Sequence, residues 1–434
     1  MSSAPSGMPV RRREIFGWAM FDFANSSYTT IIVTVAFSLF FTRLVAPADS
    51  ADVLWGIAIL ISNAIVVVLS PLVGAVADDS GRKKLFLFAS YACCVTGTAA
   101  LALAGPGSVA LAMALFVVSN LAFSFGENFA GAFLPELSTP ATIGRISGLG
   151  WGLGYFGGLA SLLLVRPLLA GGFVEANIAN LRKVWLLTAA FFLVAALPTF
   201  LLLRERAARG PRRGALEYAR VGFMRVAATA RAIGEFRELV RFLGCFFLFT
   251  AGLTTVISFA AIYAERTLAF TPGELVRLFI LLQVSAAGGA LAFGFVQDTL
   301  GAARTVRVTL LLWVAVCAAA WAVTTKSAFW WVAMAAGLGM GSLQSASRAM
   351  VGLFSPRSKE GEFFGFWGLA GKAAYAVGPP VFGAVASGTG SQRVAILTTG
   401  LFFVLGLAGM RFVDEGRGRA AAEAWREEQG RAGG

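Results

Sequence analysis

The chain has 434 residues, of which 57% are hydrophobic and 14% charged, and its mean hydropathy is +0.75. Soluble globular chains carry roughly a quarter charged residues, so this composition indicates a protein built for lipid. The formal charge of +13 is confined to connections between apolar segments, which favours membrane orientation over nucleic-acid binding. Histidine is absent and the four cysteines lie inside apolar runs, so we predict no metal site and no cofactor.

Twelve apolar runs are each long enough to cross a bilayer, which takes about 20 apolar residues. They cover residues 16–42, 53–77, 84–104, 108–134, 143–165, 184–203, 240–264, 274–297, 305–324, 328–354, 363–388 and 394–413. Backbone hydrogen bonding in lipid permits only helices or closed barrels, and these runs lack the alternating pattern of barrel strands. We therefore expect an all-α membrane protein of twelve transmembrane helices in two pseudo-symmetric six-helix halves.

Polar segments divide the chain into five parts. We expect an N-terminal tail at 1–15, a six-helix half at 16–203, a basic linker at 204–239, a second half at 240–413 and a frayed tail at 414–434. If both tails lie on one side, that side holds 26 of the 36 Lys and Arg residues and the other side holds seven. This bias predicts that both termini are cytoplasmic.

The linker contains a stretch from Leu216 to Leu239 with two open interpretations. It is either an amphipathic helix on the inner leaflet, where its bases meet anionic lipid, or a solvated connection that only sets topology.

Two short charged loops occupy matching places in the halves. Gly74, Asp78 and Gly81 of the first loop recur 220 positions later as Gly294, Asp298 and Gly301. Each copy is followed by a base, Arg82 in the first and Arg304 in the second. Glycines let two helices and a short turn pack closely, while the aspartate and the bases stay at the membrane surface. We expect the two aspartates to latch conformations rather than to contact substrate.

Polar and charged side chains inside the spans are costly and are therefore functional candidates. The predicted cavity residues are Asp22, Asn25, Tyr28, Glu127, Asn128, Arg348 and Lys372. Both acids belong to the first half and both bases to the second. Across a shared cavity they can bind the amine and carboxylate of a zwitterion, or pair with each other to close the inner gate; the alternative is static pairs that only orient helices. Without histidine, any coupled proton must use a carboxylate, with Asp22 or Glu127 as the candidates.

The stretch Trp18–Tyr28 resembles the Trp-Ala-x-x-Asp-x-Ala-Asn-Ser-x-Tyr signature of the vacuole-effluxer-like branch of the major facilitator superfamily. Similar stretches occur at Phe133–Glu136, at Ile146–Gly158 and from Ser347 to Pro379, and the two charged loops resemble those after the second and eighth helices of major facilitators. The resemblance implies a twelve-helix fold, alternating access and export of small solutes such as amino acids. Phe21 and Phe23 replace the usual Tyr and Trp.

The leading functional hypothesis is a secondary carrier that exports an amino acid or a similar zwitterion, with proton coupling as an option. The alternatives are an exporter of lipid-like or drug-like amphiphiles and a transporter-like sensor that binds a solute without moving it. A membrane enzyme is disfavoured, because the sequence has no HExxH, no serine elbow and no phosphate-binding loop. We expect a monomer in a bacterial inner membrane with a small-molecule substrate, lipid contacts and no nucleic-acid partner.

Overall fold

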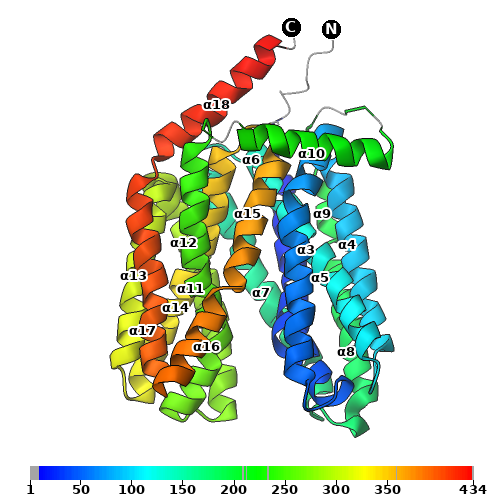
Figure 1. The fold of residues 1–434 in the computed structure, drawn as a ribbon, viewed down its shortest axis with the longest axis vertical. Coiled ribbons are helices and arrows are strands. Elements are labelled where there is room, and N and C mark those ends of the chain that lie inside the picture. Colours follow the sequence, from blue (N-terminus) through cyan, green and yellow to red (C-terminus); the bar gives the residue numbers. More distant parts are fainter. Residues whose placement is uncertain (1–8, 208–209, 212, 232–233, 358, 433–434) are drawn as a thin grey trace.

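The structure is a computed structural model that describes residues 9–207, 210–211, 213–231, 234–357 and 359–432. Parts of the expected tails and linker (1–8, 208–209, 212, 232–233 and 433–434) lie outside these ranges. Every regular element in the described ranges is a helix. Figure 1 shows two bundles side by side, with α10 (Ala215–Arg231) and α18 (Glu415–Ala432) at the same end. We call this the linker end.

The N-terminal half contains six spans, some of them built from consecutive helical segments. They are α1 (Arg12–Tyr28) with η1 (Thr29–Val35), α2 (Phe37–Phe40) and η2 (Phe41–Val45); α3 (Ala51–Ser80); α4 (Lys83–Ala100) with η3 (Leu101–Leu103); α5 (Val109–Ala132) with α6 (Leu134–Leu137); α7 (Ile143–Leu169); and η4 (Glu175–Asn177) with α8 (Ile178–Ala195) and α9 (Leu197–Leu202).

The C-terminal half repeats this plan. Its helices are α11 (Arg237–Leu268), α12 (Pro272–Leu300), α13 (Ala302–Ala322), α14 (Lys326–Phe354), α15 (Glu360–Tyr375) with α16 (Gly378–Thr389), and α17 (Gln392–Gly409) with η5 (Met410–Phe412). Ten spans of the described chain are long and apolar enough to cross a membrane by length and composition. Helix α14 and the broken α15–α16 pair occupy the places of the other two predicted spans, so the described chain agrees with the expected twelve-helix plan.

Among the spans that read as continuous apolar runs, the first and the eleventh show instructive interruptions. In the first, seven consecutive β-branched residues, Thr29–Val35, adopt a π-helical form, because such side chains crowd the preceding turn of an α-helix. In the eleventh, α15 ends at Tyr375 and α16 starts at Gly378, which is followed by Pro379 and Pro380. Proline cannot donate the helical hydrogen bond but fits a helix start, so the chain breaks at this point.

The segments that flank the second half also differ from expectation. The stretch Leu216–Leu239 does not form one helix, since α10 ends at Arg231 and α11 begins at Arg237; Gly234 lies between them, and glycine is a poor helix former. The C-terminal tail, expected to be frayed, forms α18. Its many Ala, Arg and Glu residues have high helix propensity.

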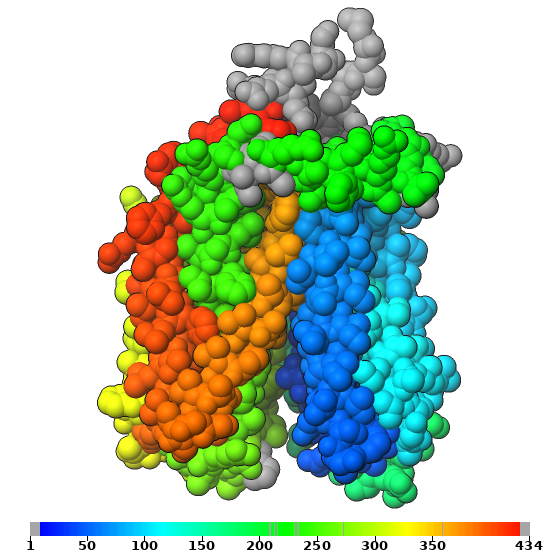
Figure 2. Space-filling view, in the orientation of Figure 1, coloured from blue at the N-terminus to red at the C-terminus, as the bar shows by residue number. Residues whose placement is uncertain are grey.

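Each half has a hydrophobic core of its own. The first is built around Trp18, Phe37 and Trp185, and the second around Phe242 and Trp313. Space-filling Figure 2 shows the halves in contact at the linker end and separated by a cleft at the opposite end. The closed linker end and the open cleft together define where a site between the halves lies.

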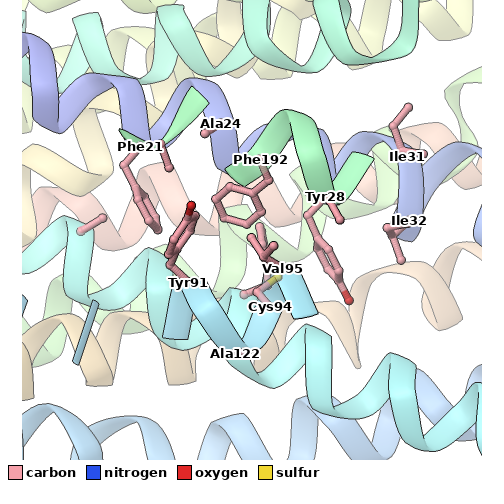
Figure 3. Packing of buried hydrophobic residues seen from close by; sticks show 14 of the residues in the cluster. Phe21, Ala24, Tyr28, Ile31, Ile32, Tyr91, Cys94, Val95, Ala122 and Phe192 are labelled. Carbon is pink, nitrogen blue, oxygen red and sulfur yellow. The ribbon is translucent and has the colours of Figure 1, made fainter. Parts of the chain in front are cut away.

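Tyr28 belongs to the first core and not to the cleft. Its side chain is fully buried, its hydroxyl hydrogen-bonds Ser119 at 2.8 Å, and its ring stacks on Phe123. Figure 3 shows it in line with Phe21 and Phe192 inside the half. Its place among the predicted cavity residues is therefore corrected.

The close approach of α7 to α1 gives a test of the packing. An added Cβ at Gly157 would overlap the carbonyl of Phe23, whereas one at Gly383 of α16 meets nothing within 4 Å. Overpacking costs about 1–3 kcal/mol. We expect Gly157→Ala to lower the thermal unfolding midpoint in detergent by several degrees, while Gly383→Ala leaves it unchanged or raises it. Equal midpoints for the two variants would contradict this packing.

Candidate functional site

Two ion pairs join the halves in the interior of the bundle. The guanidinium of Arg348 on α14 donates to the carboxylate of Asp22 on α1 at 2.6 Å. The ammonium of Lys372 on α15 lies 4.0 Å from the carboxylate of Glu127 on α5. In each pair the acid comes from the first half and the base from the second, so the structure brings together four of the predicted cavity residues.

These pairs lie deep in the bundle. Asp22 and Glu127 are each about 15 Å, at 1.5 Å per residue, from the linker-end termini of their spans at Arg12 and Leu137. The hydrocarbon core of a bilayer is about 30 Å thick. Both acids therefore lie well inside their spans, on the linker-end side of the span midpoints and between the closed linker end and the cleft.

Arg348 is held on all sides. Its Nε donates to Ser147 Oγ at 3.2 Å and its Nη2 to the Ser147 carbonyl at 2.9 Å. The guanidinium also lies over the rings of Trp18 and Trp151, 4.8 and 5.3 Å from their centroids. A planar guanidinium suits this combination of fork-like hydrogen bonding and stacking, which a lysine ammonium cannot reproduce.

The glycine-rich α7 makes room for this arrangement. An added Cβ at Gly150 would overlap Asp22 and Arg348, and one at Gly154 would lie 3.0 Å from the hydroxyl of Ser26. The glycines at these two positions therefore serve close helix packing. Ser147 and Trp151 were not predicted as site residues; their signal is that they share a helix face with Gly150 and Gly154, at spacings of three and four.

The pair between Glu127 and Lys372 is looser and more accessible. Its side chains are 31% and 18% exposed, against 16% and 5% for Asp22 and Arg348. The Lys372 ammonium also lies 5.5 Å from the centre of the Phe123 ring. A longer and more exposed pair costs less to separate.

The two predicted asparagines differ in their surroundings. Asn128 donates to Ser70 at 2.8 Å, and its amide lies where a side chain on Gly368 of α15 would be. Asn25 is buried, and its side-chain oxygen accepts no hydrogen bond from the described part of the chain. A buried acceptor without a donor is costly, so Asn25 is a candidate to receive an N–H or O–H from a bound molecule.

At the linker end, each loop aspartate caps a helix of the opposite half. Asp78, on α3, accepts the backbone N–H groups of Gly361 and Glu362, both at 2.9 Å, at the start of α15. Asp298, on α12, does the same for Gly144 at 2.8 Å and Arg145 at 3.3 Å, at the start of α7. The first N–H groups of a helix lack intrahelical partners and carry partial positive charge, so a carboxylate stabilises them.

Glycines make this capping possible. An added Cβ at Gly74 would overlap the carbonyl of Gly361, and one at Gly294 would lie 2.8 Å from the carbonyl of Gly144. The turns that follow use Gly81 at φ 59° and Gly301 at φ 89°, values that side chains disfavour. The loop repeat thus produces two related contacts between the halves.

The base of the first loop's ion-pair network is Lys83 rather than Arg82. The Lys83 ammonium lies 2.9 Å from both Glu136 and Glu360 and 3.6 Å from Asp78. Within the described residues, no carboxylate lies within 4 Å of the guanidinium of Arg82. Sequence reasoning missed Lys83, whose signal was a pair of glutamates at the linker-end boundaries of the fourth and eleventh spans.

Helix α10 bridges the two halves above this network. Arg225 on this helix, and Arg213 just before it, pair with Asp79 of the first half at 3.6 and 3.2 Å. Thr229 accepts a hydrogen bond from Lys359, which precedes α15 in the second half. Burial lowers the pKa of Lys359 from its usual value, against the opposing influence of a nearby glutamate. The linker therefore participates in the closed arrangement.

The capping aspartate gives a direct prediction. Asp78→Asn removes the charge from two hydrogen bonds and one ion pair, and charged hydrogen bonds are worth about 1.5–3 kcal/mol each. We expect the linker end to open more often. The readout is maleimide labelling of Ala132→Cys, a first-half position buried in the second-half core, in a background without the four native cysteines. The labelling rate should rise at least about fivefold.

The matched control is Asp52→Asn, at the opposite end of the same helix, and it should leave the rate unchanged. An Asp78→Asn rate equal to that of the parent protein would show that capping does not hold the linker end closed.

Comparison with known proteins places these features in a family. The profile of the family described as "Vacuole effluxer Atg22 like" matches residues 53–423. An uncharacterized MFS-type transporter of Bacillus subtilis, YxiO, is 27% identical over 408 residues, which cover 92% of this chain and 94% of the relative. Autophagy-related protein 22-1 of Penicillium rubens is 25% identical over 307 residues, 64% of this chain and 50% of the fungal protein. This chain thus spans about half the length of that fungal relative.

Solved structures show the same fold. The human organic anion transporter MFSD10 superposes with a TM-score of 0.73 at 16% identity, over 93% of this chain and all of that one. The proton:xylose symporter XylE gives 0.69 at 14% identity, over 95% and 97%. With its fold, its capped loops and a matching profile over most of its length, the chain belongs to the Atg22-like vacuole effluxer family of major facilitator transporters.

Proposed function

We propose that this protein is a secondary carrier that exports a small zwitterion, such as an amino acid, by alternating access. The observation that carries the proposal is the segregation of charge across the membrane-buried interface. Asp22 and Glu127 face Arg348 and Lys372. A zwitterion brings an ammonium and a carboxylate, so it can replace the missing partner on each half as the pairs separate.

The closed linker end and the open cleft support an alternating-access cycle. The excess of Lys and Arg at the linker end supports its assignment to the cytoplasm, which makes the present conformation outward-open. To open inward, the two pairs and the two aspartate caps must separate. Removing one partner of a buried ion pair costs about 3–5 kcal/mol, so an empty carrier changes state slowly.

A bound solute offsets this cost and thereby couples binding to movement. A proton on Asp22 or Glu127 provides a second way to neutralise one half, which supports optional proton coupling. The direction of transport is proposed from the effluxer description of the family. We place the protein as a monomer in a bacterial cell membrane, a location supported by the Bacillus subtilis relative.

Counterflow in proteoliposomes tests the substrate class. Proteoliposomes that contain the purified protein are loaded with pooled unlabelled amino acids. Labelled amino acids are then added outside at two pH values. We expect uptake by the parent protein and a loss of at least about tenfold in Asp22→Asn and Glu127→Gln, given the buried-pair cost above. The matched control, Glu217→Gln, changes an exposed carboxylate on α10 and should transport normally.

Absence of amino-acid uptake by folded parent protein would refute the zwitterion proposal. Uptake of labelled amphiphiles under the same conditions would then identify the exporter alternative. Thermal stabilisation by an amino acid without any uptake would identify a sensor.

A further inference from the structure

A polar pocket lies at the linker end of the second half, away from the central ion pairs. It has a volume of about 420 Å³ and is formed where the α12–α13 loop meets the junction of α17 and α18. Four arginines line it: Arg304 and Arg307 from α13, Arg411 from η5, and Arg417 from α18. Neither the transport proposal nor the aspartate caps use this pocket.

The carboxylates of the pocket are already engaged. Glu415 accepts the backbone N–H of Ala303 at 2.9 Å and so caps the start of α13. Asp414 lies 3.5 Å from Arg417, whose other partner is Glu238, also at 3.5 Å. The charge of Arg417 is therefore balanced by two carboxylates, and Glu415 is engaged as the cap of α13.

The other three arginines keep an excess of positive charge. Within the described residues, no carboxylate oxygen lies within 4 Å of the guanidinium nitrogens of Arg304, Arg307 or Arg411. The Nε of Arg307 is buried and has no hydrogen-bond partner there. A buried guanidinium donor without an acceptor is costly unless a ligand supplies one. The backbone N–H of Arg417 lowers the pKa of Asp414 most, and the charges of Arg417 and, least, of Arg307 lower it further against the opposing influence of burial.

The related loop of the first half shows that this excess is not required by the fold. There, Lys83 is surrounded by three acids, and Lys84 donates to the carbonyl of Leu203 at 2.6 Å. Glu205 caps the start of α4 through Lys84 N–H at 2.8 Å, as Glu415 caps α13. The two halves share the capping glutamate, but the loop of the first half places Lys83 among three carboxylates, whereas Arg304, Arg307 and Arg411 have none within 4 Å in the described residues.

We propose that this pocket binds the phosphate group of an anionic ligand. Guanidinium groups bind phosphate oxygens through paired N–H donors, and the volume is in the range of small-molecule sites, about 300–1,000 Å³. The pocket lies where α13 begins and η5 ends, the level at which membrane spans meet the headgroup region. An anionic phospholipid headgroup and a soluble phosphate monoester share the chemistry it recognises.

Binding measurements on the full-length protein test the proposal and separate the two sources. One arm records dioleoylphosphatidylglycerol adducts by native mass spectrometry, with dioleoylphosphatidylcholine as the neutral comparison. The other titrates glycerol 3-phosphate against the thermal unfolding midpoint. The variant is Arg304→Gln/Arg307→Gln, and Arg411→Gln is a second, milder change at the same pocket.

The matched control is Arg220→Gln/Arg231→Gln, which removes two exposed bases from α10 at the same end of the molecule. We expect at least a tenfold weaker apparent affinity in the pocket double variant, an intermediate loss in Arg411→Gln, and no change in the control. A loss of affinity in the lipid measurement identifies a phospholipid headgroup as the ligand, and a loss in the glycerol 3-phosphate titration identifies a soluble phosphate.

Equal affinity in the parent and in the folded pocket variants would overturn the proposal. So would an equal loss in the control variant, because that result would reflect general surface charge. Neither readout depends on transport, so a failure of the counterflow experiment leaves this test intact.

Discussion

The closed state depends on two carboxylates that bind the N-termini of helices in the opposite half. Asp78 holds the start of α15 and Asp298 the start of α7. A helix start offers N–H groups that have no partner of their own, so each half provides both an acceptor and a donor site. Water can take over these donors when the halves separate, which makes such a contact strong enough to close one end and still reversible.

The central ion pairs follow a different logic. A capped helix start can be hydrated when it opens, but Asp22, Glu127, Arg348 and Lys372 separate inside the membrane-spanning bundle, where little water is available. Their separation is expensive unless another charged group replaces the lost partner. The two aspartate caps therefore set which end is closed, and the central pairs make the change between states depend on what occupies the interface.

Much of the fold could be predicted from the chain itself. Apolar runs marked the spans, the recurrence of Gly74, Asp78 and Gly81 indicated two related halves, and charge inside the spans identified the four residues that form the central pairs, although not which acid meets which base. The interruptions could not be placed from hydropathy, because it does not register the crowding of seven β-branched residues at Thr29–Val35. Helix α18 was missed for a similar reason, since a polar composition does not exclude high helix propensity.

The sequence by itself determined which residues carry charge, how deep in a span each one lies, and that acids and bases fall on different halves. Those properties depend on local composition and on position along a helix of fixed rise. Only the tertiary structure decided the partners: Lys83 rather than Arg82 as the base of the first network, Ser147 and Trp151 around Arg348, and Tyr28 inside a core. Such choices depend on how helices far apart in the chain rotate and pack against one another, and hydropathy and spacing do not specify that rotation.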